Sequence, residues 1–160
     1  MDTPTTEFFI EKGRMPVSLM LVGGEQMSGV LFVQASARNL SALEDAPEFM
    51  NSSEAFFPLR RTDGRTLVVS KDHVLAVEVP QEFTSKGWTY GGRARVEVIM
   101  QGGTTHNGEL HLEQSVGQPR VLDHMNRRGE PFVVLQHDDG VTLLNRHHIA
   151  YVCPLDDAAA

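Results

Sequence analysis

Residues 17–33 read VSLMLVGGEQMSGVLFV, and residues 96–112 read VEVIMQGGTTHNGELHL. In both stretches apolar residues alternate with others before a Gly-Gly pair, and a single glycine then precedes a second apolar run. Alternation with a period of two is typical of a β-strand with one buried face, and glycine supplies the positive φ that a tight hairpin turn requires. Each stretch therefore predicts a β-hairpin, and their likeness predicts an internal duplication.

Two further landmarks return in the same order along the chain. Met50-Asn51 is matched by Met125-Asn126 at a distance of 75 residues, and Asp63-Gly64 is matched by Asp139-Gly140 at a distance of 76. Asp-Gly between apolar runs is a strong signal for a hairpin turn. Each half is therefore expected to contain five strands, and we predict an all-β, mainly antiparallel protein.

The repeats set the predicted domain boundaries. The first repeat is expected over 14–80 and the second over 94–155, with a linker over 81–93. The ends of the chain, 1–6 and 156–160, carry little to bury and are expected to be flexible. A short helical turn is predicted near 40–46, ending before Pro47.

Composition favours an intracellular protein whose partners are not chiefly nucleic acids. The chain of 160 residues has a formal net charge of -7, which disfavours a phosphate-binding surface. It lacks an apolar run of membrane-spanning length and a recognisable signal peptide, so we expect a cytoplasmic location without membrane contact. The single cysteine, Cys153, fits a reducing compartment and is expected to be a small core residue.

The repeat pattern resembles the Sm/LSm fold, a small and strongly bent antiparallel barrel. The resemblance lies in the Gly-x4-Gly element near the second strand, in Asp123-His124-Met125-Asn126, and in residues 144–152, LNRHHIAYV. It implies two tandem, half-open barrels of an uncharacterised bacterial family. It also implies that the fourth strand of one unit pairs with the fifth strand of the next.

The same resemblance puts forward a set of residues for RNA or partner binding. In the second repeat these are Asp123, Asn126 and Arg146, and their counterparts in the first repeat are Asn51 and Lys71. A structural alternative for Asp123 and Asn126 is the capping of turns, since both residue types accept main-chain N–H bonds.

Metal and catalytic chemistry find little support in the sequence. Six of the seven histidines lie in the second half, but the adjacent His147 and His148 would point to opposite faces of a strand. Ser115 has no nucleophile-elbow context that would join it to Asp123 and His124 in a triad. We therefore expect no catalytic residues, no metal site and no cofactor.

The function expected from these observations is that of a non-catalytic interaction or assembly module. Exposed strand edges would pair with copies of the same chain or with a protein partner. The alternative is an RNA-binding regulator that uses the loops around 123–126 and Arg146.

Overall fold

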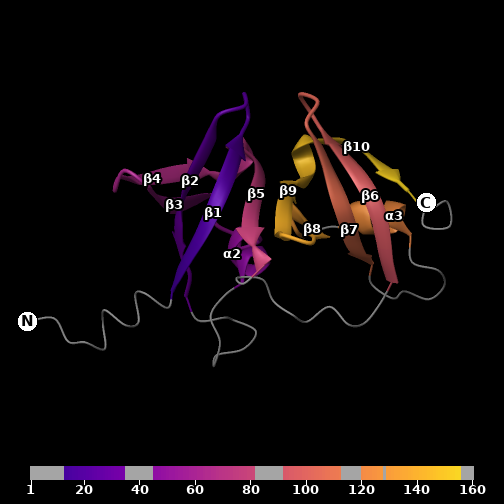
Figure 1. Ribbon diagram of the computed structural model, residues 1–160, viewed down its shortest axis with the longest axis horizontal. Coiled ribbons are helices and arrows are strands. Elements are labelled where there is room, and N and C mark those ends of the chain that lie inside the picture. The colour runs from indigo at the N-terminus through magenta and orange to yellow at the C-terminus, as the bar shows by residue number, and fades with distance from the viewer. Residues whose placement is uncertain (1–12, 35–44, 82–91, 113–119, 128, 156–160) are drawn as a thin grey trace, which may run out of the picture.

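The structure, a computed structural model, describes residues 13–34, 45–81, 92–112, 120–127 and 129–155. Two β-rich halves lie side by side (Figure 1). Within the described residues, ten strands form one antiparallel sheet, which confirms the predicted all-β, antiparallel class. The strands are β1 (Arg14–Leu21), β2 (Gln26–Phe32), β3 (Phe56–Arg61), β4 (Thr66–Ser70), β5 (Val74–Pro80), β6 (Gly92–Met100), β7 (Thr105–Leu112), β8 (Phe132–His137), β9 (Gly140–Asn145) and β10 (Ile149–Pro154). The short helical elements are α2 (Ala46–Met50), α3 (Val121–Met125), and the 3-10 turns η1 (Lys71–His73) and η3 (Arg146–His148).

The two halves have the same strand arrangement. The order in the sheet is β10-β6-β7-β8-β9-β5-β1-β2-β3-β4. In each half four consecutive strands form a meander, and the fifth strand returns to pair with the first, as β5 with β1 and β10 with β6. The duplication inferred from the landmarks therefore corresponds to two copies of one structural unit.

Glycines allow the two sharpest features of each repeat. Gly23 and Gly24, like Gly102 and Gly103, have φ values between 94° and 98°, which suit the hairpin turns predicted for them. Gly108 serves a different purpose, because a Cβ at this position would lie 2.5 Å from the main-chain oxygen of Gln136. The lack of a side chain lets β8 approach β7 closely, and this allows the sheet to bend.

The halves are joined by direct strand pairing. The fifth strand of the first repeat, β5, pairs with the fourth strand of the second, β9, from Ala76 opposite Leu144 to Pro80 opposite Gly140. Among the described residues, the fourth and fifth strands of one repeat do not pair with each other, so neither repeat closes into a barrel. The continuous sheet accordingly ends at β4 on one side and at β10 on the other, at opposite ends of the molecule (Figure 1).

Two hydrophobic cores share residues across this junction. The first core contains side chains of β1 to β5 together with Phe132, Val141 and Leu143 from the second repeat. The second core contains side chains of β6 to β9 together with Leu75 and Ala76 from the first repeat. Each core therefore includes side chains of the other half, and the two repeats pack against each other across the junction.

Several expectations are corrected by the structure. Pro47 lies in the first turn of α2 rather than after a helix, because a missing N–H costs nothing there. Residues 40–44 of the predicted helical turn, the termini 1–6 and 156–160, and most of the predicted linker lie outside the described residues. β6 begins at Gly92, so the last two linker residues belong to a strand. Cys153 is exposed, since β10 is an edge strand and this side chain points away from the core.

Within the part of the chain that the structure describes, no helix has the length and apolar character needed to cross a membrane.

Candidate interaction edges and the cleft between the repeats

The junction between the repeats is reinforced by the side chain of Asn51. Its Oδ1 accepts the main-chain N–H of Phe132 at 2.8 Å, and its Nδ2 donates to the main-chain oxygen of Phe132 at 3.4 Å. The amide therefore acts like one more ladder residue at the end of β8. Asn51, put forward for RNA or partner binding, thus binds the other repeat of its own chain.

Two more side chains of the second repeat hold the same junction. Asn145 Nδ2 donates to the main-chain oxygens of Lys71 at 3.2 Å and Val74 at 2.9 Å. His148 Nε2 donates to the main-chain oxygen of Asp72 at 2.6 Å. His147 and His148 lie in η3 and not in a strand, which corrects the expected geometry of this pair.

The two predicted cationic residues anchor main chain in equivalent ways. Lys71 is buried, and its Nζ donates to the main-chain oxygen and to Oγ of Ser52, at 3.0 and 2.9 Å. Arg146 Nε donates to the main-chain oxygen of Glu130 at 3.0 Å, and its Nη1 donates to that of His124 at 3.2 Å. Burial lowers the pKa of Arg146, and Glu130 opposes that shift. Lys71 thus holds the chain that follows α2, and Arg146 holds the end of α3 together with the chain that follows it.

Asp123 and Asn126 remain at the surface. Asp123 lies in the first turn of α3, whereas the N-cap of that helix is Arg120. Asn126 is the C-cap residue and caps through its main-chain N–H, while its exposed amide meets no hydrogen-bond partner among the described residues. The cavity beside them, lined by His124, Arg127, Glu130 and Arg146, is about 10 Å³. That volume suits one water molecule and not a nucleobase.

The sheet edges expose apolar side chains whose counterparts in the junction are buried. Gly29 approaches the main chain of Arg60 as Gly108 approaches that of Gln136, so Arg60 and Gln136 are equivalent positions. Phe56 and Phe132 each lie four residues before them and are therefore equivalent too. Phe56 is 55% exposed and Phe132 is 0% exposed.

The edge strands β4 and β10 show the same contrast with their counterparts in the junction, β9 and β5. On β4, Val68 is 75% exposed, while its β9 counterpart Leu143 is 0% exposed. On β10, Tyr151 is 60% exposed, while its β5 counterpart Ala76 is 2% exposed. Both outer edges thus carry the apolar side chains of a junction that is not formed within the described residues.

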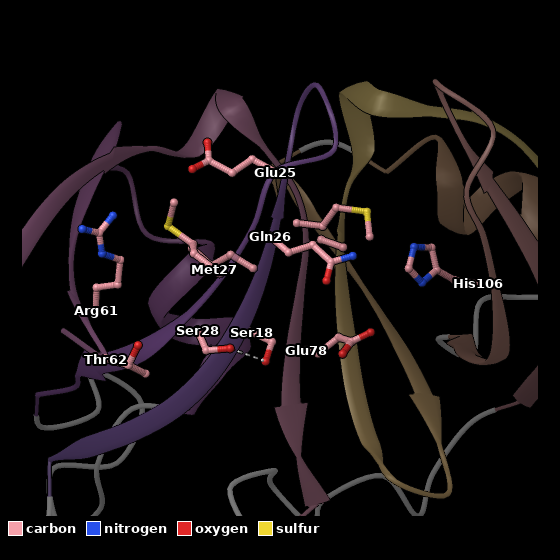
Figure 2. A pocket seen from close by; sticks show the side chains of 12 residues that line it. Ser18, Glu25, Gln26, Met27, Ser28, Arg61, Thr62, Glu78 and His106 are labelled. Atoms are coloured by element: carbon pink, nitrogen blue, oxygen red, sulfur yellow. Dashed lines mark hydrogen bonds between the residues drawn. The ribbon is translucent and has the colours of Figure 1, made fainter.

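A cleft lies between the first repeat and the second, with a volume of about 450 Å³. Figure 2 shows Ser18 on β1 and Glu78 on β5, with His106 of β7 on the opposite side of the cleft. Ser18 and Ser28 share a hydrogen bond of 3.3 Å on its wall. A second cavity of about 450 Å³ adjoins it and shares Ser18, Ser28 and Glu78.

His106 is a titratable group of this cleft whose pKa is shifted by burial. Burial lowers the pKa of His106, Glu78 opposes that shift, and His137 adds to it. Its Nε2 is buried and has no hydrogen-bond partner among the described residues. The described residues also contain no group of three or more His, Cys, Asp or Glu side chains placed to hold a metal ion. The cleft is therefore lined by hydroxyl groups, carboxylates and an imidazole that can form hydrogen bonds.

No protein-family model, curated protein or solved structure was found to match the chain.

Phe56, Val68 and Tyr151 are candidate interface residues that were not predicted from the sequence. A usable signal was present, because Val68-Val69 and Leu143-Leu144 place apolar side chains on both faces of equivalent strands. A strand that is apolar on both faces is typical of a position covered on both sides.

Proposed function

We propose that the protein is a non-catalytic assembly module that associates with protein strands through its edges β4 and β10. The observation that supports this most strongly is a contrast in burial. Phe56 on β3 and Val68 on the edge strand β4 are exposed, whereas their counterparts Phe132 and Leu143 are buried at the junction. An edge strand with unused main-chain donors and acceptors is a template for pairing with a further strand. Adjacent apolar side chains add burial energy to that pairing.

The energetic argument is one of magnitude. Burying one large apolar side chain stabilises an association by about 1.5 to 3 kcal/mol. Phe56, Val68 and Tyr151 together offer enough apolar surface to offset part of the entropy lost on association. The junction between β5 and β9 provides an example of this arrangement within the chain itself.

RNA binding is the alternative outcome, and the contacts of the named residues disfavour it. Asn51, Lys71 and Arg146 have their polar groups engaged with main chain, and the chain carries a net charge of -7. Asp123 and Asn126 are exposed, but the neighbouring cavity of about 10 Å³ leaves no room to enclose a base. A cytoplasmic location remains part of the proposal and rests on the single cysteine.

The proposal is tested by the mass of the full chain under two conditions. Light scattering after size exclusion would be applied to the purified protein over a wide concentration range, and native chromatography to a lysate of cells that express it naturally. We compare Val68→Lys with Val22→Lys, a matched change at an exposed valine in the β1–β2 turn.

The expected result is a mass above the 17.7 kDa of one chain in at least one condition. Val68→Lys should lower it to the monomer mass and Val22→Lys should not, because only Val68 lies on an edge strand. Two results contradict the proposal: a monomer under both conditions, or a large species that nuclease treatment dissociates. The second of these would support the RNA alternative.

A further inference from the structure

We propose that the partner of these edges is a second copy of the chain, bound head to tail, with β10 of one copy paired to β4 of the next. This inference rests on the proposed function and specifies its partner and register. The starting point is that the two halves are copies of one unit, but only one of the two equivalent junctions is formed within the described chain. The strands that would form the second junction are the two edge strands, β4 and β10.

The register follows from the junction that is present. β5 corresponds to β10 and β9 corresponds to β4, each at a distance of 75 residues. In the junction Ala76 lies opposite Leu144, Val77 opposite Leu143 and Glu78 opposite Thr142.

Transferring these pairs to the edges places Tyr151 opposite Val69 and Val152 opposite Val68. It also places Cys153 opposite Leu67. β10 of one copy and β4 of the next would run antiparallel, as β5 and β9 do.

The apolar side chains of the two edges fit this register. Leu143 reaches from β9 into the core of the first repeat, where Val77 is its opposite residue. Val68, in the same position on β4, would reach the second core of the next copy beside Val152, which already packs against that core. Phe56 would take the place that Phe132 has in the existing junction, so Val68 and Phe56, both exposed in the single chain, become buried.

A polar contact repeats as well. Asn51 holds the main chain of Phe132 across the existing junction. Its counterpart Asn126 projects an amide without a partner among the described residues, and the counterpart of Phe132 is Phe56. In the assembled pair Asn126 would therefore hold the main chain of Phe56 of the next copy.

The second junction should be weaker than the first. Thr66 stands in place of the buried Val141, and Ser70 stands in place of Asn145, whose amide bonds two main-chain oxygens of the first repeat. Without these contacts the affinity is lower, so association requires a higher protein concentration. A head-to-tail contact repeats on every copy, so it gives a closed ring or a filament according to the rotation between copies.

The register is tested by oxidative cross-linking of the full chain, using the native Cys153. Leu67→Cys places a thiol directly opposite Cys153 of the next copy, where cross-strand Cβ atoms are about 4.5 to 5.5 Å apart, close to the roughly 3.5 to 4.5 Å of a disulfide. Val68→Cys and Thr66→Cys are the matched controls, because each is displaced by one residue and its side chain points to the other face of the strand. A second matched pair, Val68→Cys with Val152→Cys in a Cys153→Ala background, uses an exposed position and guards against misfolding of Leu67→Cys.

We expect the matched pairs to give at least about five-fold more reducible dimer and higher species than the displaced controls. Cross-linking by Leu67→Cys should disappear in a Cys153→Ala background. An association that is sensitive to Val68→Lys but shows equal cross-linking for matched and displaced thiols would overturn the register and leave the proposed function standing. A purified monomer that enlarges only in lysate would overturn self-association and point to a foreign protein. A monomer under both conditions would overturn both proposals.

Discussion

At the scale of single residues, the two asparagines that follow α2 and α3 have the same sequence context and different surroundings. Asn51 bonds the main chain of Phe132, whereas the amide of Asn126 faces solvent. A polar side chain that satisfies a buried N–H contributes to stability chiefly because its loss leaves that N–H unpaired. The contribution of each asparagine amide to stability therefore indicates whether the junction beside it is formed.

We predict that Asn51→Ala lowers the free energy of unfolding of the dilute protein by about 1 to 3 kcal/mol. Asn126→Ala should leave that free energy unchanged and weaken self-association by about two- to tenfold. Urea unfolding at low concentration measures the first quantity, and sedimentation equilibrium measures the second. Equal effects of the two substitutions on unfolding would contradict the assignment.

Gly108 provides a second prediction at this scale. A Cβ there would lie 2.5 Å from the main-chain oxygen of Gln136, so Gly108→Ala must displace β8. We expect a loss of about 1 to 3 kcal/mol in the free energy of unfolding, measured by urea denaturation. Asn107→Ala, at the exposed neighbouring position, is the control and should be nearly neutral. If the two variants unfold alike, the close approach of β7 and β8 is wrong.

His106 gives a prediction for pH dependence. Burial holds the pKa of His106 below its ordinary value of 6.5, despite the nearby Glu78 carboxylate and with His137 acting in the same direction as burial. The unfolded chain then binds more protons than the folded one, so stability is complete above the ordinary pKa and falls as the pH drops through it.

His106→Gln should therefore lose less stability than the wild type when the pH is lowered from about 8 to about 5.5. Thermal or urea unfolding at both pH values gives this difference. A wild-type protein and a variant with parallel pH profiles would show that His106 does not titrate in a buried setting.

At the scale of elements, local patterns predicted the strands well. Gly23-Gly24 and Gly102-Gly103 define hairpin turns through their positive φ, and alternating apolar residues define the strands beside them. Such features depend on neighbours in sequence, which is why the chain alone is sufficient to predict them. The duplication followed from the same landmarks.

Features that depend on distant partners were predicted less well. Cys153 was expected in the core because its run is apolar, but β10 ends the sheet and only one of its faces is covered. Pro47 was expected after a helix, but Asp45 caps Glu48 N at 2.9 Å and starts a helix there.

The candidate site shows the same limit. Asn51 and Lys71 were selected through a resemblance, and their actual partners, Phe132 and Ser52, could not be identified without the arrangement of the repeats. Resemblance to a family with bent barrels did suggest pairing between a fourth and a fifth strand, and β9 with β5 is such a pair. The identity of the fold as an Sm-like barrel stays a prediction.

At the scale of the whole molecule, one junction is formed inside the chain and its counterpart is divided between β10 and β4. A head-to-tail assembly uses both edges in every contact, whereas a symmetric pairing of β4 with β4 would use only one. The two arrangements can therefore be separated by observing both edges at once.

The most direct measurement is hydrogen–deuterium exchange of the full chain at low and high protein concentration. Main-chain N–H groups exchange slowly when they are bonded in a ladder, so pairing of the edges slows their exchange. We predict that amides of β4 and β10 become protected together as concentration rises, while those of the β1–β2 turn do not change. Exchange rates that are independent of concentration in both strands, or protection of only one of them, would contradict the head-to-tail account.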